Sequence, residues 1–369
     1  MPRNSAAGSG STTSDPMGGS MVIILIIVVF VVTTPLIYSA TFAAEGSGTA
    51  SAASTSTSSV ASSSASPAVL AWSPSVSYPT SIWTQSCVES GGYIYCVGGL
   101  TGPNTVTDAA SAVYYAPISS SGVGNWTSTT SYPTSIRSES CVTETSTIYC
   151  VGGYAGSILS DAVYYAPLSS SGVGPWANTT SYPFPLWLTS CVTSSSGIYC
   201  VGGGTSGSAL SSSDAVYFAP FSSSGIGQWV STTSYPAGVK QQSCVASGTE
   251  IYCVGGYLST NVYYATLFPS GVGKWANTTG YPFTVGANLA SCVVIGEEVF
   301  CVGGHTGPNV SSDVYHALIS TSGIGQWLNS TNYPVGVFGQ SCVVSGGQIY
   351  CVGGETASGS ILSGVSYSS

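Results

Sequence analysis

The feature that most constrains this chain is a cysteine pair that recurs six times with one spacing. In each pair a Ser-Cys-Val run is followed, nine residues after its cysteine, by the cysteine of a Cys-Val-Gly-Gly run. The pairs use all twelve cysteines: Cys87 with Cys96, Cys141 with Cys150, Cys191 with Cys200, Cys244 with Cys253, Cys292 with Cys301, and Cys342 with Cys351. A block of about 50 residues therefore repeats from residue 70 onward, and the fold must accommodate six similar units.

Each copy contains four short runs of β-branched and aromatic residues, separated by clusters of Gly, Ser, Asn and Asp. In the copy that begins at Trp126 the runs are SESCVT, TIYCVGG, DAVYYAPL and the WANTTSY that follows. Such runs between turn-forming clusters are typical of strands. No stretch outside the N-terminal region has helical periodicity. The sequence predicts an all-β fold with four strands per copy, the SESCVT strand innermost and the Trp-bearing strand outermost.

The repeats resemble the kelch repeat. A hydrophobic strand that ends in Gly-Gly, as in IYCVGG, precedes a Tyr-bearing strand, as in AVYYAP, and then a Trp that lies seven residues before the Pro of a Tyr-Pro. The resemblance covers residues 70 to 369 and implies a six-bladed kelch-like β-propeller. The Tyr-to-Trp connection, PLSSSGVGPW and its equivalents, is longer than in kelch repeats. The low charge and the Ser/Thr-rich composition are similar to those of archaeal cell-surface proteins.

The two ends of the repeat region predict how the ring closes. The last copy stops after a third strand, ILSGVSYSS, and the first copy begins with an unpartnered Trp strand within residues 70–79. We expect residues 70–79 to supply the outer strand of the last blade, because this arrangement leaves no open sheet edge between the ends.

The cysteine spacing predicts disulfides. A two-residue turn at Gly91 and Gly92 places Cys87 opposite Cys96 at a non-hydrogen-bonded position, where Cα atoms are about 4.5 Å apart and a disulfide can form. Zinc sites instead use cysteines two to four residues apart, and the chain has only two histidines. We therefore expect one disulfide per copy, an oxidising compartment outside the cytoplasm, and neither metal nor cofactor.

The N-terminal region differs from the repeats. Residues 1–20 are expected to be a disordered cytoplasmic segment. Residues 21–44 begin with twelve consecutive apolar residues and carry no charge, which predicts a helical transmembrane signal anchor or a signal peptide cut near Ala43 and Ala44. The expected products are a single-pass membrane protein or a secreted protein. Residues 45–66 read as a flexible Ser/Thr/Ala-rich linker, and residues 67–369 as the propeller.

Charge excludes nucleic acid as a main partner. Only 5% of the residues are Asp, Glu, Lys or Arg, and the net charge is -9. Proteins that bind nucleic acid neutralise phosphates with clustered Lys and Arg. This chain has four such residues: Arg3, Arg137, Lys240 and Lys274.

Positions that vary between copies indicate where a ligand could bind. The residue four before the first cysteine of each pair is Trp83, Arg137, Trp187, Lys240, Asn288 or Phe338. Two residues later, the polar members include Gln85, Glu139, Gln242 and Gln340. The resemblance to kelch propellers places both positions at one mouth of the central channel, together with His305 from a neighbouring loop. Aromatic, amide and charged groups suit a saccharide or a protein ligand; alternatively, they only fill the channel.

The sequence favours a binding or adhesion module over an enzyme. Galactose oxidase, a kelch-like enzyme, needs a copper site with several His ligands, and six-bladed sialidases use three arginines. Outside its N-terminal segment this chain has only two histidines, His305 and His316, and one arginine, Arg137. The expected partners are a surface glycan or protein and, through the N-terminal segment, a membrane. The alternatives are a structural coat component without a ligand and a glycan-active enzyme.

Five sequons predict N-linked sugar on a chain outside the cytoplasm, although Asn-Thr-Thr is also good turn chemistry. They lie at Asn125, Asn178, Asn277, Asn309 and Asn329. Four of them are close to the Trp of the outermost strand, so sugar there would shield a sheet edge.

Overall fold

A computed structural model describes residues 70–369 except 209, 284–288 and 308, and this part is all-β. It contains strands, turns and loops, and within it no helix is long and apolar enough to cross a membrane. The predicted cytoplasmic segment, membrane anchor and linker lie outside the described residues.

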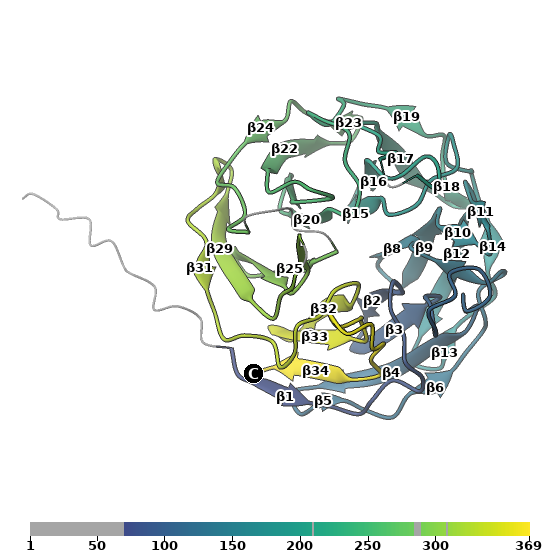
Figure 1. Ribbon diagram of the computed structural model, residues 1–369. Helices are drawn as coiled ribbons and strands as arrows, with labels where there is room; N and C mark the ends of the chain where they lie inside the picture. The colour runs from purple at the N-terminus through teal and green to yellow at the C-terminus, as the bar shows by residue number, and fades with distance from the viewer. Residues whose placement is uncertain (1–69, 209, 284–288, 308) are drawn as a thin grey trace, which may run out of the picture. The chain divides into compact units, whose positions relative to one another are not determined.

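Six antiparallel sheets, each with one cysteine pair, surround a common centre (Figure 1). We number them sheets 1 to 6 along the chain. Their innermost strands are β2 (Ser86–Ser90), β8 (Ser140–Glu144), β15 (Ser190–Ser194), β20 (Ser243–Ser247), β25 (Ser291–Ile295) and β32 (Ser341–Ser345). Their second strands are β3 (Tyr93–Val97), β9 (Thr147–Val151), β16 (Gly197–Val201), β21 (Glu250–Val254), β26 (Glu298–Val302) and β33 (Gln348–Val352).

The third and outermost strands complete the sheets. The third strands are β4 (Val113–Ser119), β12 (Val163–Ser169), β17 (Val216–Ser222), β22 (Val262–Phe268), β29 (Val314–Ser320) and β34 (Val365–Ser368). The outermost strands are β6 (Thr127–Ser128), β14 (Ala177–Asn178), β19 (Val230–Ser231), β24 (Ala276–Asn277), β31 (Leu328–Asn329) and β1 (Trp72–Pro74). The four predicted runs therefore appear in the predicted order, from the centre outward.

The cysteine hairpins have the predicted register. In sheet 1, Ser90 lies opposite Tyr93 and Cys87 opposite Cys96 across the turn at Gly91 and Gly92. All six pairs are disulfides with Cα atoms 4.0 Å apart. Disulfide bonding is confirmed, and it indicates an oxidising environment.

The predicted partner of the first Trp strand is also confirmed. β1 pairs antiparallel with β34, with Trp72 opposite Ser368. The last sheet therefore has the strand order β1-β34-β33-β32, in which the two ends of the repeat region hydrogen-bond to each other.

Trp and Tyr-Pro recur because they join neighbouring sheets. The Trp126 indole packs edge-on against Tyr78 of the preceding sheet, with ring centroids 4.8 Å apart, and donates its Nε1 hydrogen to the Val76 carbonyl. The other five tryptophans that precede a Tyr-Pro make the same hydrogen bond at 3.1–3.2 Å: Trp72 to Thr331, Trp176 to Thr130, Trp229 to Thr180, Trp275 to Thr233 and Trp327 to Thr279. These contacts form a closed outer circle.

The Ser-Cys dipeptides form a second circle nearer the centre. Because each first cysteine lies at a non-hydrogen-bonded position of its own hairpin, its amide is free to bond elsewhere. The Cys141 amide donates to Ser86 Oγ of the preceding sheet, and the Cys87 amide donates to Ser341 Oγ. The same bond joins every pair of neighbouring sheets.

The long Tyr-to-Trp connection forms an additional small hairpin that the sequence did not predict. Five third strands run past the sheet and turn back as two-residue strands: β5 (Gly122–Val123), β13 (Gly172–Val173), β18 (Gly225–Ile226), β23 (Gly271–Val272) and β30 (Gly323–Ile324). The Val173 amide of one such hairpin donates to Thr129 Oγ1 of the preceding sheet. The insertion therefore adds a further contact between sheets.

The hydrophobic core lies between neighbouring sheets. One cluster combines Val192 and Tyr199 of sheet 3 with Cys253 and Trp275 of sheet 4. Because each sheet buries both faces in this way, burial of apolar area stabilises the ring as a whole.

Candidate functional site

Two sets of residues form the rim at one end of the channel. The residue four before the first cysteine forms a bridge with the residue four after the second cysteine: Trp83 with Leu100, Arg137 with Tyr154, Trp187 with Gly204, and Phe338 with Glu355. Additional strands shape this rim: β7 (Ile136–Arg137), β10 (Tyr154–Ala155), β11 (Ile158–Leu159), β27 (His305–Thr306) and β28 (Asn309–Val310).

A closed circle of backbone hydrogen bonds forms the floor beneath the rim. The residue after each first rim position has a φ of 52° to 64°: Thr84, Ser138, Leu188, Gln241, Leu289 and Gly339. Each donates its amide hydrogen to the carbonyl of the equivalent residue in the preceding sheet, at 2.8–3.2 Å. Five of the six are not glycine, although this conformation is unfavourable for other residues. The fold therefore imposes a strained turn at five of the six sheets.

Above this floor lies a cavity of about 700 Å³, which we call the mouth cavity. Five predicted residues line it: Trp83, Arg137, Trp187, His305 and Phe338. Lys240 lies beside it and Asn288 lies outside the described residues. The structure thus brings together side chains from five sheets.

One wall of the mouth cavity is cationic. The Arg137 guanidinium carbon lies 4.2 Å from the Tyr154 ring centroid, and Arg137 Nε donates to the Thr105 carbonyl at 2.9 Å. Lys240 Nζ donates to the Ser208 carbonyl and lies 5.4 Å from the Trp187 ring centroid. Burial lowers the pKa of Arg137 and that of Lys240, because desolvation disfavours the charged form.

The facing wall is aromatic. Trp83 and Phe338 pack edge to face with centroids 5.8 Å apart, and the His305 ring lies 4.1 Å from Phe338. Trp83 and Phe338 are partly exposed, so these aromatic groups can contact a ligand in the cavity.

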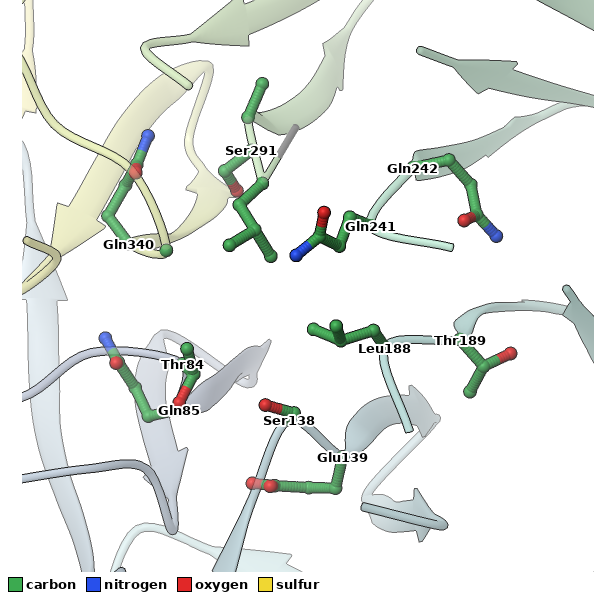
Figure 2. Close-up of a pocket in the computed structure, with 13 residues that line it drawn as sticks. Thr84, Gln85, Ser138, Glu139, Leu188, Thr189, Gln241, Gln242, Ser291 and Gln340 are labelled. Atoms are coloured by element: carbon green, nitrogen blue, oxygen red, sulfur yellow. The ribbon is translucent and has the colours of Figure 1, made fainter. Parts of the chain in front are cut away.

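The second predicted set does not reach the mouth cavity. Gln85, Glu139, Gln242 and Gln340 are buried and line a smaller cavity of about 130 Å³ in the channel. Figure 2 shows these side chains farther from the centre than Thr84, Ser138, Leu188 and Gln241. Nε2 of each glutamine donates to a second-strand carbonyl of the preceding sheet at 2.6–2.7 Å: Gln85 to Val352, Gln242 to Val201 and Gln340 to Val302. These three glutamines therefore hydrogen-bond neighbouring sheets to each other.

Glu139 occupies the place of a glutamine in this series. Its Oε1 lies next to Gly98, as Nε2 of Gln85 lies next to Gly353. A carboxyl oxygen therefore occupies the place at which three other copies have the donor Nε2 of a glutamine. Both carboxyl oxygens are buried, and no side chain donates a hydrogen bond to either. Burial raises the pKa of Glu139 to about 8, opposed by the Glu139 and Ser86 amides and by Arg137. Burial therefore favours the neutral form of Glu139.

From the second half of the rim, the sequence predicted the loops and only one individual residue, His305. Tyr154 and Tyr257 line the mouth cavity from the position four after the second cysteine, and Thr105 holds Arg137. A signal was present, because the residue that follows Cys-Val-Gly-Gly differs in every copy except for a repeated Tyr: Leu100, Tyr154, Gly204, Tyr257, His305 and Glu355.

The opposite end of the channel is built differently. After the innermost strands' cysteines, a cavity of about 350 Å³ is lined mainly by valines, and Glu89 is the one charged residue among the described residues of its lining. Glu89 Oε1 accepts hydrogen bonds from the Gly92 amide and from Ser345 Oγ. We call this the valine end.

Other predicted sites can be placed as well. All five sequon asparagines are exposed; Asn309 lies on the rim hairpin, and the others adjoin or lie within outermost strands. Sugar at these positions remains a prediction. Among the described residues, no group of three or more His, Cys, Asp or Glu could hold a metal ion. His316 lies away from the mouth cavity, where it is buried against Phe300 with Nδ1 3.2 Å from Glu298 Oε1.

Comparison with known proteins indicates the fold. No known family profile matches the chain, and no curated protein matches it in sequence. Many chains of solved structures match its fold. One is the structure titled "Structure of YjhT", with 13% identity and a TM-score of 0.64 over 78% of this chain and 94% of that chain. At this identity the likeness shows the fold alone, a ring of the β-propeller type.

Proposed function

We propose that this chain is a six-bladed kelch-like β-propeller outside the cytoplasm, and that it binds a saccharide in the mouth cavity. The N-terminal segment would anchor the propeller to the membrane or direct its secretion. The observation that carries the proposal is the mouth cavity itself, in which the residues that differ most between copies converge: Trp83, Arg137, Tyr154, Trp187, His305 and Phe338.

The size and lining of the mouth cavity support a compact ligand. Small-molecule sites enclose about 300–1,000 Å³, and this cavity has about 700 Å³. Protein partners instead bury about 800 Å² of surface on each side. The partly exposed Trp83 and Phe338 can stack on the apolar face of a sugar ring, while Arg137 can bind its oxygen atoms. These groups favour binding rather than catalysis, because the lining contains, among the residues that the structure describes, no pair of carboxylates for general acid and base work.

A glycan array tests this proposal. We expect the full chain to bind a set of saccharides, and Trp83→Ala, Trp187→Ala and Phe338→Ala each to weaken that binding at least tenfold. Phe268→Ala is the matched control, because Phe268 is an exposed aromatic residue outside the mouth cavity. Unchanged binding in all three mouth variants, or no saccharide bound by the wild type, would contradict the proposal.

A second candidate, a coat component that associates with copies of itself, is favoured by one observation. Three loops around the rim present large apolar side chains to solvent: Ile158 is 71% exposed, Leu210 84% and Leu258 60%. Exposed apolar groups near one another often mark association surfaces. If this is the function, the purified full chain will assemble in sedimentation experiments, and Ile158→Ser with Leu210→Ser will abolish assembly.

A further inference from the structure

The charge of the mouth cavity is opposite to that of the whole chain. The described residues contain three Lys and Arg, and two of them, Arg137 and Lys240, lie in or beside this cavity. None of the described residues that line it is Asp or Glu. Glu355, which occupies the rim position equivalent to Tyr154, is not part of the lining either. A chain with a net charge of -9 therefore presents a local cationic site.

Arg137 is held in place but not neutralised. Stacking on Tyr154 and the bond from Nε to the Thr105 carbonyl fix the guanidinium plane. Its two Nη atoms have no hydrogen-bond partner among the described residues. The nearest carboxyl group along the chain is that of Glu139, which is buried below the floor and lines the smaller cavity instead. A fixed guanidinium with free Nη donors matches the two oxygens of an anion.

The mouth cavity continues outward on the same side as Arg137. A second cavity of about 780 Å³ lies between the loops that follow the second strands of sheets 2 and 3. It shares Tyr154 and Gly207 with the mouth cavity and is lined farther out by Ile158, Phe184 and Pro185. A ligand bound at Arg137 can extend through this outer groove rather than end at the rim.

We propose that the ligand is a linear acidic oligosaccharide. One sugar unit places its carboxylate or sulfate against the Arg137 Nη atoms and its ring between Tyr154 and the facing aromatic wall. The following units pass Gly207 and lie in the outer groove against Phe184. This inference rests on the proposed function and specifies its ligand class.

The test compares matched probes on one array. The probes are linear oligosaccharides of one to six units that carry a uronate or a sulfate, together with the methyl ester of each uronate and the unsulfated form of each sulfate. We expect the acidic form to bind at least tenfold more tightly than its neutral counterpart, and affinity to rise with length. The uronate and sulfate arms identify which anion fits.

Two variants localise the effects. Arg137→Gln should bind acidic and neutral forms equally, whereas Lys274→Gln, which removes the same charge from an exposed site outside the mouth cavity, should keep the preference. Ser157→Trp, at an exposed residue that lines the outer groove and not the mouth cavity, should abolish the gain with length and keep the preference for the acid. Unchanged thermal unfolding verifies that each variant is folded.

Several outcomes would overturn the inference. If the wild type binds acidic and neutral forms equally and Trp83→Ala weakens that binding, the proposed function stands but the ligand is not recognised through an anionic group. If the acidic form is preferred but affinity does not rise with length, the outer groove does not bind the following sugar units. Tighter binding of an acidic peptide than of any oligosaccharide would replace the ligand class. Absence of any binding would contradict both the inference and the proposed function.

Discussion

The two ends of the channel are made by the same repeated strands, yet they differ in regularity. At the valine end, the residue after the first cysteine is valine in all six copies: Val88, Val142, Val192, Val245, Val293 and Val343, each at most 9% exposed. At the mouth, the residue four before that cysteine is aromatic, cationic or amide. Identical packing between sheets requires identical residues, whereas the rim only needs its backbone bridges. The mouth is therefore the end at which the chain can vary without loss of the ring.

The largest effect is expected at Glu139, beneath the mouth. In the folded state its pKa is about 8, above the ordinary value near 4.5, so the folded protein loses stability as pH rises from 4.5 to 8. Glu139→Gln supplies the amide donor that three other copies have, and it should raise the free energy of unfolding by about 3 kcal/mol at pH 7 and by somewhat more at pH 9. At pH 4 the difference should nearly vanish. Chemical denaturation at the three pH values measures it; an equal effect at all three would contradict a neutral Glu139.

The next largest effect on stability is expected at the disulfide hairpins, which run between the mouth and the valine end of the channel. Replacing both Cys141 and Cys150 with serine opens a ten-residue loop and should lower the free energy of unfolding by about 3 kcal/mol. The loss should be independent of pH between 4 and 8, because disulfide cysteines do not titrate. Denaturation of the double variant tests this, with the same experiment on Cys342 and Cys351 as the matched pair. A loss of unfolding free energy that changes with pH would show that the variant acts through Glu139 instead.

The smallest effect concerns the strained floor beneath the mouth. Gly339 has a φ of 64° and Thr84 a φ of 55° in the same hydrogen-bonded circle. Gly339→Ala should lower stability by about 1 kcal/mol, because alanine disfavours this conformation, and Thr84→Gly should raise it by a similar amount. Thermal unfolding of the two variants measures the sign of each change in stability. A change of the same sign in both would mean that side-chain packing, not backbone strain, governs this position.

Part of this architecture follows from counting residues along the chain. The nine-residue spacing with a two-residue turn fixes which residues lie opposite each other, so the hairpin register and the pairing of Cys87 with Cys96 could be predicted. The unpaired Trp72 strand predicted its pairing with the last strand. Both are consequences of local spacing and of unpaired edges, which the sequence displays directly.

The candidate site could be predicted only in part. The positive φ at Thr84 and its equivalents reorients the chain between Trp83 and Gln85. Variation between copies had grouped these two residues together, but Trp83 lines the mouth cavity whereas Gln85 hydrogen-bonds the neighbouring sheet. Sequence spacing does not report that reversal. The contribution of Tyr154 depends on a bridge to Arg137 between segments 17 residues apart, which a reading of the first rim position alone does not include.

Footprinting tests most directly the central claim that the mouth is the binding end. The full chain would be exposed to hydroxyl radicals with and without the tightest-binding saccharide from the array, and side-chain oxidation would be measured by mass spectrometry. The account predicts protection of Trp83, Trp187 and Phe338, with no change at Phe268 or at the valine end. Protection at the valine end with an unprotected mouth would contradict it.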